Sequence, residues 1–221
     1  MSIFTDDRYL DIEKKVKELI GREKTFLSSS TVSSTRAIGN AIQNIIASNF
    51  ESVVTDYCKQ YSSDFARRSM ADFAFEDKEG NYYVIDVKTH NVETKFNMPN
   101  LTSVHRLARL FYNEAYREKD YFTLLIVQYK IQNLDINVLD VHFVPVENLD
   151  WDCLTIGALG WGQIQIANSR NIQIDRGLKR KHWMLRMCDE LNDFYPREIA
   201  KIRERSEFFE QTRLFWQEWP E

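Results

Sequence analysis

The chain has few cysteines and histidines and lacks any long apolar run. Its three cysteines are odd in number and widely spaced (Cys58, Cys153, Cys188), which favours buried thiols over a disulfide framework or a zinc cluster. The four histidines form no pair at metal-ligand spacing. No apolar stretch approaches the length of a membrane span, and the first residues do not resemble a signal peptide. We therefore expect a cytoplasmic protein.

Composition predicts one soluble globular domain that spans residues 1–221. Apolar residues make up 43% of the chain and charged residues 28%, which is ordinary for a protein with a sizeable core. The net charge of −4 argues against binding nucleic acid by bulk electrostatics, although it is compatible with a local basic face.

Hydrophobic periodicity predicts an α/β fold with a central mixed β-sheet flanked by helices. Apolar residues recur at helical spacing over 9–19 and 37–54, and a Ser/Thr-rich stretch before the second segment can cap it. The polar residues 76–81 separate two β-rich runs, which is typical of a hairpin. Further strands are expected at 122–129 and 136–144.

The remaining segments are assigned from polarity and helical spacing. The polar run 89–100 predicts a loop, and 101–111 a helix. The segment 181–219 is expected to be helical and interrupted at Pro196, with its aromatic side chains in the core or a subunit interface.

The second strand of the hairpin carries the clearest chemical signal. Asp86 and Lys88 are two residues apart, so they share one face, and the paired strand brings Asp72 into the same neighbourhood. Two carboxylates beside a lysine can form a Mg²⁺ site at which the lysine positions or deprotonates the attacking water. The alternative is an ordinary ion pair between Asp86 and Lys88 on a solvated strand face.

A glycine-rich segment, 157–166, provides a candidate for base reading. Its glycines permit tight turns and close approach of the backbone to a ligand. Gln163 and Gln165 share one face of an extended segment, and glutamine can read adenine in the major groove. A glycine-rich β-bulge with solvated glutamines is the alternative.

A basic cluster follows directly and suggests a phosphate-contacting surface, although a charge run is also typical of a solvated face. Its members are Arg170, Arg176, Lys179, Arg180, Lys181 and Arg186.

Three ordered blocks resemble a known family. Asp72 with Asp86-Val87-Lys88 is similar to the core of the PD-(D/E)xK nucleases, with Ala71 in place of the family's proline. The run from Pro99 to Ala108 and the run 158–166 resemble type II restriction endonucleases of the EcoRV-like branch, and the helix at Trp183-Met184 is also similar.

The resemblance implies a homodimeric prokaryotic endonuclease with a restriction-endonuclease-like core. Such an enzyme makes a Mg²⁺-dependent, blunt double-strand cut in a short palindrome, here a GTTAAC-like site, and is paired with a cognate DNA methyltransferase. The resemblance also implies that Asp72, Asp86 and the carbonyl of Val87 bind the metal, while Lys88 assists the water.

The resemblance divides the domain into N-terminal helices (1–60), a catalytic core sheet (61–150), a DNA-reading segment (151–180) and C-terminal helices (181–221). It assigns 96–100 to the minor groove and 157–165 to the major groove. The implied DNA contacts are Thr89, Asn97, Met98, Asn100, Gly160, Trp161, Gly162, Gln163, Gln165, Arg180 and Lys181.

Two positions depart from the family, and two other functions compete. Gln43 stands where relatives commonly have glutamate, and Gly157 where a related base-reading segment has asparagine. A structure-specific nuclease of DNA repair or recombination is one alternative, against which the paired glutamines argue. An inactive DNA-binding relative is the other, against which the intact Asp72, Asp86 and Lys88 argue.

Overall fold

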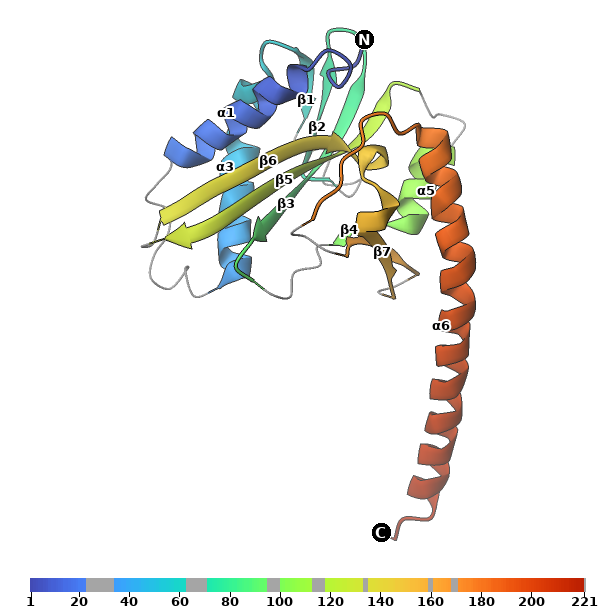
Figure 1. Ribbon diagram of the computed structural model, residues 1–221. Helices are drawn as coiled ribbons and strands as arrows, with labels where there is room; N and C mark the ends of the chain where they lie inside the picture. Colours follow the sequence, from blue (N-terminus) through green and yellow to red (C-terminus); the bar gives the residue numbers. More distant parts are fainter. Residues whose placement is uncertain are drawn as a thin grey trace.

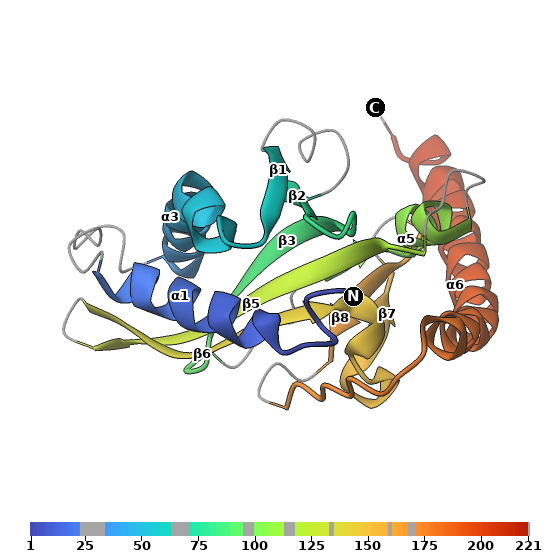
Figure 2. The same cartoon turned by 90° about the horizontal axis from the view of Figure 1, so that it is seen from above.

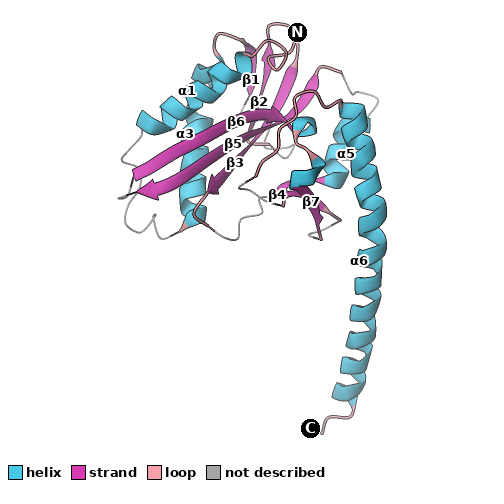
Figure 3. Ribbon diagram, in the orientation of Figure 1, coloured by secondary structure: helices cyan, strands magenta, loops and turns pink. Residues whose placement is uncertain are grey.

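The computed structural model describes residues 1–22, 34–62, 71–94, 100–112, 118–132, 135–158, 161–167 and 171–220. Helices and strands alternate irregularly along the chain (Figure 1, Figure 3). In chain order they are α1 (Arg8–Arg22), α3 (Thr35–Val54), β1 (Cys58–Ser62), β2 (Phe73–Asp77), β3 (Tyr82–Asn91), β4 (Asn100–Ser103), α5 (Val104–Tyr112), β5 (Asp120–Gln132), β6 (Asp135–Pro145), the 3₁₀ turns η1 (Val146–Asn148) and η2 (Trp151–Cys153), β7 (Leu154–Gly157), β8 (Gln163–Ile166) and α6 (Arg180–Gln217).

A mixed five-stranded sheet in the order β1-β2-β3-β5-β6 forms the centre of the molecule. β3 and β5 run parallel, and the other neighbours are antiparallel. Helices α1 and α3 lie over one face of this sheet (Figure 2). The predicted α/β class with a mixed sheet and flanking helices is therefore confirmed.

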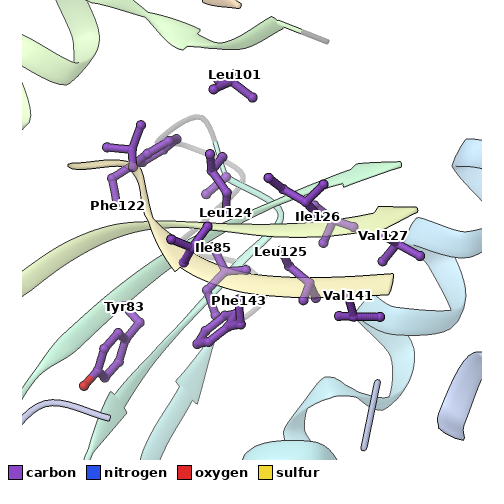
Figure 4. Close-up of a cluster of buried hydrophobic side chains, with 14 of the residues drawn as sticks. Tyr83, Ile85, Leu101, Phe122, Leu124, Leu125, Ile126, Val127, Val141 and Phe143 are labelled. Carbon is purple, nitrogen blue, oxygen red and sulfur yellow. The ribbon is translucent and has the colours of Figure 1, made fainter. Parts of the chain in front are cut away.

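The two faces of the sheet have different partners. Ile85 and Phe143 are buried on the helical side, whereas Phe122 and Leu124 point the other way, toward Leu101 of β4 (Figure 4). β4 belongs to a second, three-stranded sheet in the order β4-β8-β7. The second face of the main sheet is thus partly covered by the small sheet.

The predicted hairpin and N-terminal helices are confirmed. β2 and β3 pair antiparallel around residues 78–81, and Ser34 caps α3 by accepting a hydrogen bond from the backbone N–H of Ala37. All three cysteines are free thiols, but only Cys153 is buried, so the expectation of buried thiols holds for that residue alone.

Three predictions of local structure were wrong. A loop was expected from residue 89, but β3 continues to Asn91. The reason is that β5 pairs with β3 along its whole length. Residues 100–103 form β4 and not the start of a helix, because β8 supplies the antiparallel partner. Pro196 lies inside α6 without ending it; the residues around it are largely exposed, so water can satisfy the carbonyl that lacks its N–H partner.

No helix among the described residues is long and apolar enough to cross a membrane.

Candidate functional site

Asp72 joins the two hairpin strands at the point where β2 begins. Its backbone N–H donates to the carbonyl of Ile85 at 2.8 Å, and its carboxylate Oδ2 accepts the N–H of Val87 at 2.7 Å. The side chain thus takes the place of a strand partner, since β2 pairs with β3 only from Phe73 onward. The carboxylate is thereby fixed beside β3.

Asp86 and Lys88 lie on the face of β3 opposite α3 and form an ion pair of 2.6 Å between Oδ2 and Nζ. Asp86 is 8% exposed. Burial raises its pKa from the usual 3.8 to about 7; the charge of Lys88 opposes this rise, and the nearby carboxylate of Asp72 adds to it. The side chains of Lys88 and Asp86 are 21% and 11% exposed, so this pair is more buried than the solvated pair that was the alternative.

Gln43 connects α3 to the same site. Its Nε2 donates to the carbonyl oxygen of Val87 at 2.9 Å. One turn earlier, α3 approaches β3 closely at Gly39, where an added Cβ would lie 2.7 Å from Oγ1 of Thr89. A carbonyl oxygen has two lone pairs, so the bond from Gln43 leaves one for a metal ion.

An open pocket of about 430 Å³ brings the strand residues together with the second sheet. Asp86 and Lys88 form one wall, and β4, Trp161 and Gln163 form the others. Two catalytic candidates, Asp86 and Lys88, therefore share one pocket with the base-reading candidate Gln163. Lys88 and Gln163 are 75 residues apart in the sequence (88 to 163). Arg106 also lines this pocket. The sequence analysis did not single it out, because its segment has the pattern of an ordinary amphipathic helix.

The donor set of the site suits a hard cation that retains water. Among the described residues, no three His, Cys, Asp or Glu side chains gather closely enough to hold a metal ion. Asp72, which directly precedes β2, and Asp86 and the Val87 carbonyl of β3 would supply oxygen ligands to such an ion. Mg²⁺ is bound in this way by one or two carboxylates together with waters and a substrate phosphate, so the residues fit the ion.

The polar face of the small sheet is organised around Gln165. Gln163 and Gln165 lie on one face of β8, while Ile164 and Ile166 are buried on the other, as the alternation predicted. Nε2 of Gln165 donates to Oδ1 of Asn100 on β4. The same amide lies over Gly157, where an added Cβ would be 2.5 Å from Oε1. Glycine at 157 is therefore the residue that leaves room for the Gln165 amide.

Two of the residues predicted to contact DNA pack closely against neighbouring elements. Gly162 is buried with φ of +114°, and an added Cβ would lie 3.1 Å from Val104 and 3.3 Å from Ile156. Thr89 faces Gly39 of α3, on the face of β3 opposite Asp86 and Lys88. The sequence did not predict the contacts of Gly162 with Val104 and Ile156, or the contact of Thr89 with Gly39.

Three described members of the basic cluster have different surroundings. Arg180 forms hydrogen bonds at 2.8 and 2.6 Å to the buried Glu147 and donates to the carbonyl of Asp120, so its guanidinium already has partners within the fold. Arg176 stacks on Tyr9, with its guanidinium 3.5 Å from the ring centroid. Lys181 is exposed, as the prediction requires.

Among the other predicted contacts, one is exposed at the pocket and several lie outside the described residues. Trp161 is 82% exposed at the edge of the pocket, where a nucleic acid can reach it. Asn97, Met98, Gly160 and Arg170 lie outside the described residues.

No protein-family model matches the chain, and comparison with curated proteins gave no match. The geometry of the site therefore carries the functional argument.

Proposed function

We propose that the protein is a Mg²⁺-dependent endonuclease that makes a blunt double-strand cut within a short palindromic DNA site. The observation that carries this proposal is the shared pocket, in which the Asp86–Lys88 pair faces Gln163 of the small sheet. A site for hydrolysis and a side chain that can read a base edge lie within reach of one bound duplex. Pairing with a protective DNA methyltransferase belongs to the same proposal.

Each side chain has a role in this reaction. Asp72 and Asp86 would hold the ion with the Val87 carbonyl, and the bound ion supplies Lewis-acid stabilisation of charge on the scissile phosphate. Lys88 lies within 2.6 Å of Asp86 and can position the attacking water with its Nζ. Gln43 orients the Val87 carbonyl through its 2.9 Å hydrogen bond.

The proposal is tested by incubating duplex DNA with the purified protein in Mg²⁺ or in EDTA and sequencing the ends. Discrete fragments with common blunt ends, formed only with Mg²⁺, are expected. Cleavage restricted to branched DNA would instead favour a structure-specific repair nuclease. Tight binding without cleavage would favour the inactive DNA-binding relative.

Replacing Gln163 with alanine is expected to reduce discrimination between the cognate site and sites with one substituted base pair. A lost bidentate contact to a base costs about 1–3 kcal/mol, or about 5- to 150-fold in the ratio of cleavage rates. Competition cleavage of cognate and substituted duplexes measures this ratio. Gln60→Ala on β1, an exposed glutamine outside the pocket, is the matched control. An unchanged ratio would remove Gln163 from base reading.

Replacing Gln43 with glutamate is expected to destabilise the metal-free protein by about 1–3 kcal/mol, because an acceptor would face the Val87 carbonyl in place of a donor. Added Mg²⁺ should recover more stability in this variant than in the wild type, since the new carboxylate lies beside a ligand oxygen. Urea unfolding with and without Mg²⁺ measures both effects. Gln43→Leu, which loses the bond without adding charge, should show no larger response to Mg²⁺ than the wild type does.

A further inference from the structure

The second half of α6 and the two residues that follow it extend away from the rest of the molecule as an arm of residues 195–219 (Figure 1). The buried residues of α6 are Trp183, Met187 and Phe194, and all three precede the arm. Among the described residues that follow Phe194, none is buried. Tyr195 donates a hydrogen bond from its hydroxyl to the carbonyl of Trp161 at 2.9 Å. Beyond it, the arm has no buried side chain of the kind from which helices of globular proteins gain most of their stability.

Large apolar side chains form a regular stripe on this arm. Tyr195, Ile202, Phe209 and Trp216 follow one another at intervals of seven residues, which places them on one face. Three of them are far more exposed than core residues, at 59% for Ile202, 66% for Phe209 and 62% for Trp216. Exposed stripes of this size mark interaction surfaces. Neighbouring positions widen the stripe: Ile199, Phe208, Phe215 and Trp219.

Charge is distributed unevenly along the arm. Residues 197–205 carry four basic and two acidic side chains, a net charge of 4 − 2 = +2. Residues 206–218 carry one basic and three acidic side chains, a net charge of 1 − 3 = −2. Two copies aligned antiparallel would set each basic half against an acidic half, whereas a parallel alignment would set like against like.

The apolar stripe is compatible with the same antiparallel alignment. If Ile202 lies level with Phe209 of the partner subunit, Tyr195 falls level with the partner's Trp216. The same register sets Glu198 level with the partner's Arg213. An apolar seam and a charge pair thus follow from one alignment.

We propose that the arm is a dimerisation element that pairs antiparallel with the same segment of a second copy. The pairing has two-fold symmetry, which is the symmetry of a palindromic DNA site. In this respect the inference deepens the proposed function and rests on it. The stripe and the charge asymmetry, however, are properties of the free protein.

Sedimentation of the full chain without DNA tests the proposal. The wild type is expected to be a dimer, and Ile202→Glu combined with Phe209→Glu should raise the dimer Kd by at least about 100-fold. Ala200→Glu combined with Gln211→Glu adds the same charge on the opposite face and should leave the dimer intact. Circular dichroism and urea unfolding verify that each variant is folded.

Orientation is tested by charge reversal. Glu198→Arg should weaken the dimer, and adding Arg213→Glu to the same chain should restore it, because only the antiparallel pairing brings the two reversed charges together. A monomeric wild type, or a dimer unaffected by the Ile202 and Phe209 variants, would overturn the proposal. A monomer that still cuts DNA at discrete sites would overturn the arm alone, and a dimer that depends on the arm but never cuts would overturn the endonuclease alone.

Discussion

Asp86→Asn is expected to slow cleavage severely and yet to make the metal-free protein more stable at about pH 8. The variant loses a metal ligand and the ion pair that orients Lys88, so the cleavage rate should fall by about 10²- to 10⁴-fold. It also removes a buried carboxylate whose ionised form is disfavoured by burial. The expected gain in the free energy of unfolding is about 1–3 kcal/mol at about pH 8.

The pH dependence follows from the raised pKa of Asp86. In the unfolded chain the carboxyl loses its proton near 3.8, whereas in the folded protein it keeps the proton up to a pKa of about 7. The contribution of the protonated Asp86 carboxyl to the free energy of unfolding is therefore fully present at pH below 3.8. It is lost as the pH rises to about 7. This loss should be absent from Asp86→Asn.

Urea unfolding in EDTA across this pH range measures the effect, and Asp189→Asn, an exposed carboxylate on α6, is the control. Mg²⁺ should stabilise the wild type and have no such effect on Asp86→Asn. A variant whose cleavage rate stays within about 10-fold of the wild-type rate, or that responds to Mg²⁺ as the wild type does, would contradict the metal site. A variant less stable than the wild type at about pH 8 would contradict the assigned burial effect.

Arg180→Ala is expected to destabilise the fold by about 3–5 kcal/mol, because it leaves the Glu147 carboxylate buried without its ion-pair partner. The same side chain donates to the carbonyl of Asp120 and lies over the rings of Phe111 and Tyr121, so packing is lost as well.

Urea unfolding measures this change in the free energy of unfolding. Lys181→Ala, the exposed neighbour, should stay within about 0.5 kcal/mol of the wild type. A stable Arg180→Ala protein with a flatter salt dependence of DNA binding would contradict this structural role and support Arg180 as a phosphate contact.

Local patterns in the sequence determined the hairpin, the first two helices and the common face of Asp86 and Lys88. Each of these depends on the period of a helix or strand, which neighbouring residues set by themselves. The shared face of Gln163 and Gln165 has the same origin.

Tertiary structure decided which of these patterns come together. The strand at 100–103 exists because β8 pairs with it, and the pocket exists because this small sheet lies beside β3. The hydrogen bond from Gln43 to Val87 spans 44 residues. Long-range pairs of this kind leave no period in the sequence, which is why Gln43 was noticed only as a departure from a family pattern.

The environment of the basic residues was the property least predictable from the sequence. The positions of the basic residues in the sequence determined that the chain carries a basic cluster. Only the fold decided that Arg180 pairs with the buried Glu147 and that Lys181 is exposed. The physical reason is that Arg180 and Lys181 are adjacent, so the sequence around them is nearly the same. The burial of each side chain and its nearest carboxylate depend instead on elements far away in the chain.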